Sequence, residues 1–513
     1  MKLYTIRLMT SIILLILTFN SNAQESAKEN YDILIKNGTV IDGTGRSGFS
    51  ADVLVKDDKI ITIGDVDIST INVDLIIDAK GKIVSPGFID SHAHGNPIKT
   101  PEFNNFSGMG VTTIFLGQDG ESAANISEWI KKVEEAEPAI NIGTLVGHGT
   151  VRDEAGVKLN PNPSKEDIEQ MAKLVDEAMV AGAFGLSTGL EYQPGSFSEL
   201  DEIVAIAKPV GIRGGIVHSH IRNEDDDVIE SSIEELIQQG KKGECDVQIS
   251  HIKVTFGHGK ERAKKVIAQM EKARNEGISI TADIYPYTAS YTGIAIVFPD
   301  WAKPPHIYED VVKNKREELA EYLRKRITLR NGPESTLFGT APWAGKTLKE
   351  VAAQLGKPFE DVLIDDIGPK GASAAYFVMD SELQDELFID PYVMVCTDGS
   401  PTMRHPRGYG SFAKVIRYFV RETKMLKLEE AVRKMTGLPA ERIGLLEQKR
   451  GLIKPDFAAD ILIFDPQKVN DKATFENPHQ LAEGFDYVIV NGALIKDDGD
   501  FTGNRGGQVL VKN

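Results

Sequence analysis

The chain has 513 residues, which is too long for one ordinary domain and predicts two or three. Hydrophobic residues make up 41% of the chain and charged residues 26%, the balance typical of a globular protein in water. The formal net charge of −18 argues against a protein that binds nucleic acid or an anionic membrane surface.

The N-terminal segment has the three parts of a secretory signal peptide. Lys2 and Arg7 are basic, Ile12–Leu17 form a short apolar run, and Ser21-Asn22-Ala23 offer small residues for cleavage. We therefore predict a signal peptide over residues 1–23 and an exported mature chain, either periplasmic or secreted. The apolar run is too short to remain as a stable membrane anchor.

Short alternating strands occur near both ends of the chain. Residues 31–65 alternate apolar and polar side chains between turn signals, and 459–466 and 487–495 repeat this style. We predict that 24–84 and 448–513 form one β-sandwich that brackets the rest of the chain.

The middle of the chain alternates strands with amphipathic stretches, which predicts helices packed on a parallel sheet. Four of these stretches are 165–179, 198–207, 227–240 and 261–276. Eight apolar segments are strand candidates: 83–91, 111–117, 141–148, 183–188, 214–220, 246–252, 278–285 and 392–398. Eight such units predict an α/β fold, a TIM-like (β/α)8 barrel over 85–447. The connection over about 288–390 is far longer than an ordinary loop and predicts an inserted subdomain between strands seven and eight.

Histidines and aspartates gather where these strands end. His92 and His94 are two residues apart, so they project from the same side of the first strand. Active-site residues of such barrels lie at the carboxyl ends of the strands. The other strand ends supply Asp119, His220, His251 and Asp398.

Four of the chain's ten histidines fall at three strand ends, which predicts a site for divalent metal ions. The predicted ligands are His92, His94, Asp119, His220, His251 and Asp398. His218 lies one pleat deeper than His220 and is interpreted as a core residue. Asp398 is the predicted catalytic base, because a carboxylate beside a metal can take a proton from water and pass it on.

These motifs resemble the amidohydrolase superfamily, and in detail its D-aminoacylase (N-acyl-D-amino-acid deacylase) family. The resemblance covers nearly the whole mature chain. The segments that carry it are Tyr31–Gly43, Pro86–His94, 110–120, Gly185–Gly195, His220–Glu224, Ile249–Lys253, Tyr285–Tyr287 and the end that begins at Asn504.

The resemblance implies zinc, as one or two divalent ions. It implies that His92, His94 and Asp398 hold the more weakly bound ion, and that His220 and His251 hold the tighter one. The family often has a cysteine at the end of the second strand, where this chain has Asp119. An oxygen ligand selects zinc less strongly than a thiolate does, so metal identity and number are open.

An N-acyl amino acid carries a free carboxylate, which calls for cations and hydroxyl groups in its site. The predicted substrate-binding residues, supported by the resemblance, are Lys253, Arg407, Tyr192, Tyr287, Ser290 and Arg222.

The predicted function is metal-dependent hydrolysis of N-acyl-D-amino acids to a carboxylate and a free D-amino acid. The expected partner is this small molecule, and the protein is expected to be a monomer or a small homo-oligomer. Two alternatives stay open. One is another hydrolase of linear or cyclic amides, such as a dipeptidase or a dihydroorotase-like or hydantoinase-like enzyme. The other is an exported binding protein with a structural metal, although six ligand candidates facing a cleft argue against a closed structural site.

Overall fold

The computed structural model describes residues 28–512. The predicted signal peptide, residues 1–23, lies outside the described residues. Within them, no helix is both long enough and apolar enough to cross a membrane.

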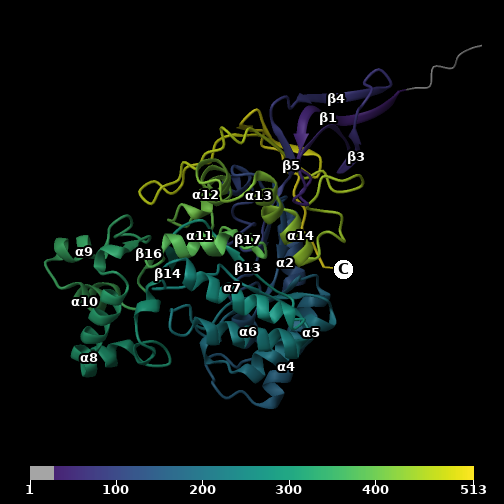
Figure 1. Cartoon of the computed structure of the whole chain (residues 1–513). Helices are drawn as coiled ribbons and strands as arrows, with labels where there is room; N and C mark the ends of the chain where they lie inside the picture. Colours follow the sequence, from purple (N-terminus) through teal and green to yellow (C-terminus); the bar gives the residue numbers. More distant parts are fainter. Residues whose placement is uncertain (1–27, 513) are drawn as a thin grey trace, which may run out of the picture.

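Parallel strands form a barrel in the middle of the chain (Figure 1). One sheet contains β6, β7 and β8, and a second runs from β9 through β10, β11, β12 and β13 to β17. The bounds are β6 (Phe88–Asp90), β7 (Val111–Leu116), β8 (Asn141–Thr144), β9 (Val146–Gly147), β10 (Gly185–Gly189), β11 (Ile216–His220), β12 (Asp246–Ile249), β13 (Ile280–Ile284) and β17 (Val393–Val395). Since β8 and β9 are two parts of one strand broken at Leu145, these are the eight predicted strands.

The first and last strands meet and close the barrel. The backbone N–H of Asp398 donates to the carbonyl of His92 at 2.8 Å, and that of Thr397 donates to the Asp90 carboxylate at 3.0 Å. This junction brings the ends of the first and eighth strands together, although Asp90 and Thr397 are 307 residues apart in sequence.

The first predicted strand, 83–91, is divided at Gly87. Its first half, β5 (Ile83–Pro86), belongs to another sheet, and only its second half enters the barrel. A Cβ atom at Gly87 would lie 2.0 Å from the Thr112 hydroxyl oxygen, so the close approach of the neighbouring strand requires glycine here.

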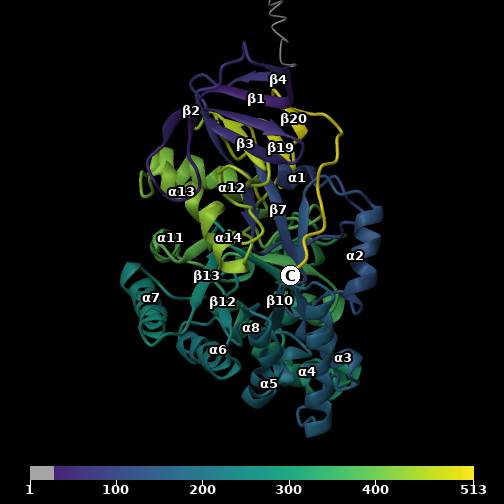
Figure 2. The same cartoon turned by 90° about the vertical axis from the view of Figure 1, so that its right-hand side faces the viewer.

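Helices cover the outside of the barrel, α4–α7 in the lower part of Figure 2. The four amphipathic stretches in the sequence become four of these helices, and their apolar faces pack inward. The helices outside the insertion are α1 (Asn104–Ser107), α2 (Ile126–Glu135), α3 (His148–Glu154), α4 (Lys165–Val180), α5 (Leu200–Ile212), α6 (Ile229–Gly243), α7 (Lys260–Asn275), α11 (Ser381–Ile389), α12 (Arg407–Lys414), the π-helix η6 (Val415–Glu422), α13 (Leu428–Met435) and α14 (Gly437–Ile443).

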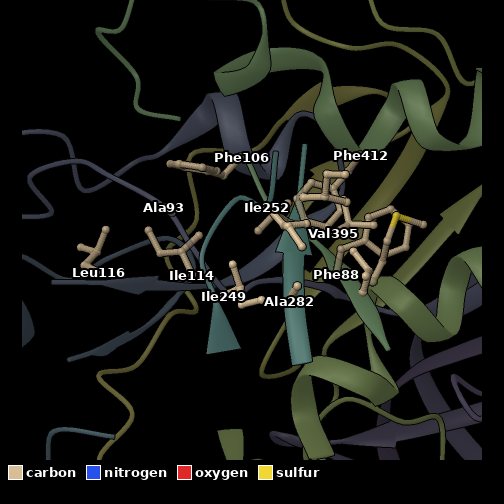
Figure 3. Packing of buried hydrophobic residues seen from close by; sticks show 14 of the residues in the cluster. Phe88, Ala93, Phe106, Ile114, Leu116, Ile249, Ile252, Ala282, Val395 and Phe412 are labelled. Atoms are coloured by element: carbon tan, nitrogen blue, oxygen red, sulfur yellow. The ribbon is translucent and has the colours of Figure 1, made fainter. Parts of the chain in front are cut away.

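The barrel's main core fills the space between strands and helices (Figure 3). Phe88 of the first strand stacks on Phe412 of α12, with ring centroids 5.7 Å apart. Ile249, Ala282 and Val395 extend the same cluster along neighbouring strands, and all three are fully buried. This packing fixes the strand ends on which the candidate site depends.

Both ends of the described chain enter one nine-stranded sheet, drawn at the top of Figure 2. Its strands are β1 (Glu29–Val40), β2 (Phe49–Lys56), β3 (Lys59–Gly64), β4 (Ile71–Asp78), β5, β18 (Ile461–Phe464), β19 (Phe485–Val490), β20 (Ala493–Asp497) and β21 (Asp500–Phe501). Hydrogen bonds connect all nine strands, from both predicted segments, into a single sheet, and a bridge between Lys59 and Ala458 links β3 to the segment before β18. The packing of this sheet as a β-sandwich stays a prediction.

The long connection between β13 and β17 forms a unit with its own hydrophobic core. It lies on the left in Figure 1, next to the barrel. Its elements are β14 (Ser290–Gly293), η2 (Ile294–Val297), η3 (Asp300–Ala302), α8 (Tyr308–Leu329), η4 (Pro333–Ser335), β15 (Thr336–Phe338), α9 (Leu348–Leu355), α10 (Phe359–Asp361), η5 (Val362–Ile367) and β16 (Ser373–Tyr376). The predicted end at 390 is too late, because Leu383, Leu387 and Phe388 of α11 pack into the barrel core.

Candidate metal centre

The strand ends bring the six predicted metal ligands together. Ligand atoms of four of them lie within 4.8 Å of one another, and a second group of three shares one member with the first. The first group is His92, His94, Asp119 and Asp398, and the second is Asp119, His220 and His251.

The spacing of the first group suits one ion. The His94 Nε2 atom lies 3.2 Å from Asp398 Oδ1 and 3.4 Å from Asp119 Oδ2, and His92 Nε2 lies 3.4 Å from Asp119 Oδ1. Ligand atoms about 2.1 Å from a tetrahedral ion are about 3.4 Å apart. In addition, no residue among 28–512 is a hydrogen-bond partner of either ring nitrogen of His92, although the side chain is fully buried. A buried imidazole needs a partner for the lone pair of its ring nitrogen, and a divalent cation is such a partner. The residues therefore fit a divalent cation.

The second group has comparable spacing. His251 Nε2 lies 3.3 Å from Asp119 Oδ1 and 2.9 Å from His220 Nδ1. Asp119 is thus the residue that both groups share. With four imidazoles and two carboxylates, the donor set is nitrogen and oxygen only. Among the described residues, both cysteines lie outside these groups.

Three of these residues have strained backbone. Asp119, His251 and Asp398 have φ angles of 55°, 36° and 47°, in the left-handed region that favours glycine. Each stands where a strand turns into the loop that follows it. Residues held in this region cluster at functional sites, where the surrounding fold imposes the conformation.

Charges around the site keep its carboxylates ionised. Burial opposes ionisation of Asp398, but Arg407 and His251 outweigh it and hold the pKa of this carboxyl well below its usual range. The same competition, between burial and the neighbouring histidines, holds the pKa of Asp119 well below its usual range. Both side chains are therefore anionic donors at neutral pH.

A cavity of about 480 Å³ opens over these ligands. Its walls come from the barrel loops and from the insertion, which contributes residues of β14 and the Lys303-Pro304 segment. His94, Asp119, His220, His251 and Asp398 line it. The volume suits a small molecule rather than a polymer.

Four of the six predicted substrate-binding residues line this cavity: Lys253, Arg407, Tyr192 and Ser290. Lys253 Nζ lies 2.5 Å from Glu224 and 2.8 Å from His251 Nδ1. Arg407 is buried between the Tyr285 ring and Asp398, with Nη1 2.8 Å from the carboxylate. Their role toward a substrate stays a prediction.

The structure places the other two outside the cavity, which corrects the prediction for both. Tyr287 is buried, and its ring packs against His405 and Phe475. The N–H of Tyr287 donates to the carbonyl of Tyr285 at 3.0 Å, so a tight turn follows β13 at this point.

Arg222 turns away from the cavity toward α6. Its Nε and Nη2 atoms contact the Glu235 carboxylate at 2.9 and 2.8 Å, and Nη2 also donates to the carbonyl of Ser198. This arginine ties two barrel loops together. His218 is buried, and burial lowers its pKa to about 3, as suits a neutral core histidine.

Two cavity residues were missed in the sequence. Glu191 lies 3.0 Å from His220 Nε2, and Glu224 lies 3.4 Å from His251 Nδ1. Glu191 is the last residue of the motif Gly-Leu-Glu, which begins at the end of β10. Glu224 is the last residue of the motif His-Ile-Arg-Asn-Glu, which begins at the end of β11. Their position after strand ends was the available signal.

Three comparisons identify the family. Residues 75–208 and 382–495 match the model of the Amidohydrolase family. A D-aminoacylase of Alcaligenes xylosoxydans xylosoxydans is 33% identical over 95% of this chain and 99% of its own length. An N-acyl-D-aspartate deacylase of the same organism is 33% identical over 95% of this chain and 96% of its own.

A solved structure agrees with the sequence comparisons. The N-acyl-D-glutamate deacylase of Bordetella bronchiseptica, in complex with zinc and a phosphonate that mimics the tetrahedral intermediate, has a TM-score of 0.80. Its sequence is 31% identical, and the match covers 94% of this chain and all of that one. The chain therefore belongs to the amidohydrolase family, and within it to the group that includes D-aminoacylase and the N-acyl-D-amino-acid deacylases.

Proposed function

We propose that the protein hydrolyses the amide bond of N-acyl-D-amino acids with the help of one or two divalent metal ions, zinc among them. The observation that carries this proposal is the pair of ligand groups sharing Asp119 at the base of a cavity that also contains Arg407 and Lys253. The relatives named above support the choice of substrate.

His92, His94, Asp119 and Asp398 would hold one ion, and Asp119, His220 and His251 a second. A divalent ion in such a site supplies Lewis-acid polarisation of the amide carbonyl and makes water more acidic.

Asp398 would carry the proton in this reaction. The oxygen of water forms a bond to the carbonyl carbon, and Asp398 takes the proton that this water releases. The carbon–nitrogen bond then breaks as Asp398 returns the proton to the departing amine. The products are a carboxylic acid and a D-amino acid, and the acid then loses its remaining proton to the free amine or to water, which leaves a carboxylate and balances atoms and charge.

Arg407 and Lys253 would orient the free α-carboxylate of the substrate. A guanidinium can bind a carboxylate through two parallel hydrogen bonds, which fixes its orientation as well as its position. A cyclic ureide or lactam has no such carboxylate, so this pair of cations favours the linear substrate.

We also propose a division of the chain into domains. The nine-stranded sheet, whose strands lie between Glu29 and Pro86 and between Ile461 and Phe501, would support the barrel. The insertion, from about 288 to 380, would cover the cavity as a subdomain. We propose export through the N-terminal segment, to the periplasm or the medium, with residues 1–23 removed. Cell fractionation and N-terminal sequencing of the mature protein would test this.

The function is tested with the purified protein after removal of metal by a chelator. The substrates are the N-acetyl derivatives of D-Glu, D-Asp, D-Leu, D-Met and D-Ala. Each is incubated with the metal-free protein and with protein reloaded with zinc, cobalt or manganese, and the released amine is measured. We expect release of amine only with metal present. Equal release without metal, or none from any of the substrates, would overturn the proposal.

A further inference from the structure

The histidine at the end of β11 has different partners on its two ring nitrogens. His220 Nδ1 faces the metal ligands, 2.9 Å from His251 Nε2 and 3.9 Å from Asp119 Oδ1. His220 Nε2 faces the other way and lies 3.0 Å from the carboxylate of Glu191. The side chain of His220 is only 3% exposed, so few alternative partners can reach it.

We propose that Glu191 is a positioning residue for the metal centre. Its carboxylate accepts a hydrogen bond from Nε2–H of His220, which leaves the lone pair on Nδ1, the nitrogen that faces Asp119 and His251. A carboxylate on the outer nitrogen of a metal-binding histidine fixes the tautomer and the ring orientation, and raises the basicity of the ligand. The inference rests on the proposed metal-dependent function.

The backbone holds Glu191 in place for this role. It follows β10 directly, and the N–H of the preceding residue, Leu190, donates to the carbonyl of His220 itself at 2.9 Å. The loop that carries the carboxylate is therefore bonded to the residue whose ring it contacts. The Tyr192 ring lies against the same imidazole, with centroids 4.4 Å apart, and limits its rotation.

Glu191 could instead ligate an ion of its own, since Glu191, His220 and Glu224 also lie within ligand distance of one another. Glu224 argues against this reading. It is already paired with the buried ammonium of Lys253 at 2.5 Å, so a cation placed there would have to compete with that ammonium. His220 also cannot offer Nε2 to such an ion and at the same time donate Nε2–H to Glu191.

Other histidines of the centre lack this arrangement. Within the described part of the chain, His92 has no hydrogen-bond partner on either ring nitrogen. On His251, the outer nitrogen Nδ1 has Lys253 Nζ at 2.8 Å and Glu224 only at 3.4 Å. The ion held by His220 is therefore the one whose affinity depends on Glu191.

The test compares Glu191→Ala and Glu191→Gln with Glu121→Ala, at a carboxylate that lines the same cavity and is not a member of the ligand groups. Metal content is measured by mass spectrometry after dialysis against a graded series of chelator concentrations. The visible spectrum of the cobalt-loaded protein reports the coordination geometry. Thermal unfolding of the metal-free proteins reports whether the variants fold.

We expect Glu191→Ala to weaken the affinity for one ion by about 10–100-fold and to change the cobalt spectrum. Glu191→Gln should weaken it less, because the amide oxygen still accepts a hydrogen bond from Nε2–H. The unfolding temperature of the metal-free protein should stay close to that of Glu121→Ala.

Two results would overturn the inference. One is an ion affinity for Glu191→Ala within twofold of that for Glu121→Ala. The other is the complete loss of one ion in both Glu191 variants with the remaining ions bound as before, which would make Glu191 a ligand. A wild-type protein that retains no divalent ion at all would instead contradict the proposed function.

Discussion

The guanidinium of Arg407 and the carboxylate of Asp398 lie 2.8 Å apart, and their side chains are only 1% and 8% exposed. The proposed proton carrier and the proposed substrate-binding cation are thus paired with each other. A substrate carboxylate that binds Arg407 would take over part of this interaction beside the base.

Replacement of Asp398 tests its role as the proton carrier. Asp398→Asn keeps the size of the side chain and an oxygen that can reach an ion, but it cannot accept a proton. We expect kcat to fall by about 10²–10⁴-fold, the usual contribution of general acid–base catalysis, while the metal content falls little. Near-normal turnover in a metal-loaded variant would exclude the assigned role. Asp300→Asn, at a side chain that is 94% exposed, is the control.

Arg407 can be tested with a matched pair of substrates. Arg407→Lys keeps the charge but loses the planar fork that binds a carboxylate through two bonds. We expect KM for an N-acyl-D-amino acid to rise by about tenfold or more, and KM for the corresponding α-carboxamide to change little. Equal effects on both substrates would mean that Arg407 does not recognise the carboxylate.

Asp119 should determine which ions the centre prefers. Asp119→Cys would place a soft thiolate between the two ligand groups, and thiolates favour zinc over manganese. In a solution with equal zinc and manganese, we expect the variant to bind a larger proportion of zinc than the wild-type protein does. Asp119→Ala should retain less of either ion. An unchanged ratio in Asp119→Cys would argue that Asp119 is no ligand, with Glu121→Gln as the control.

The buried amine of Lys434, on α13, should make the free energy of unfolding depend on pH. Lys434 is fully buried and donates to the carbonyl of Asp390, and burial lowers its pKa to about 7. In the unfolded chain the amine binds its proton up to about pH 10.4, so between pH 7 and that value the unfolded state holds more protons. The contribution of Lys434 to the free energy of unfolding therefore increases as the pH rises from about 7 to about 10.4.

The variant Lys434→Met removes this dependence. Relative to it, the wild-type protein should gain up to about 2 kcal/mol in free energy of unfolding between pH 7 and pH 9. Urea denaturation at both pH values measures the gain. Lys427→Met, at an exposed lysine, should leave the dependence intact. Parallel pH curves for Lys434→Met and the wild-type protein would rule out a buried neutral amine.

Site residues could be predicted from the sequence where they stand at the ends of regular strands. His92, His94, His220, His251 and Asp398 could be predicted because strand ends in a parallel barrel converge, and Asp119 because it ends the second strand. The four helices α4–α7 followed from amphipathic spacing in the same way.

The failures occurred where the chain leaves regular structure. Tyr287 and Arg222 stand in loops, and there a tight turn and an ion pair with Glu235 decide where each side chain points. Nor could periodicity separate β5 from β6, since the division at Gly87 depends on contact with Thr112 from a different strand. Glu191 was missed because its role depends on His220, which is 29 residues away.

The reaction proposed for this active site is the metal-dependent cleavage of N-acyl amino acids of the D configuration. The zinc-loaded protein is given the D and the L enantiomers of each N-acetyl amino acid named above, in separate reactions. The rate of amine release from the two enantiomers is then compared. We expect the D form to be cleaved and the L form to stay nearly intact, and we expect this activity to be lost when the metal is removed. Cleavage of the L forms with the D forms left intact would contradict the proposed reaction.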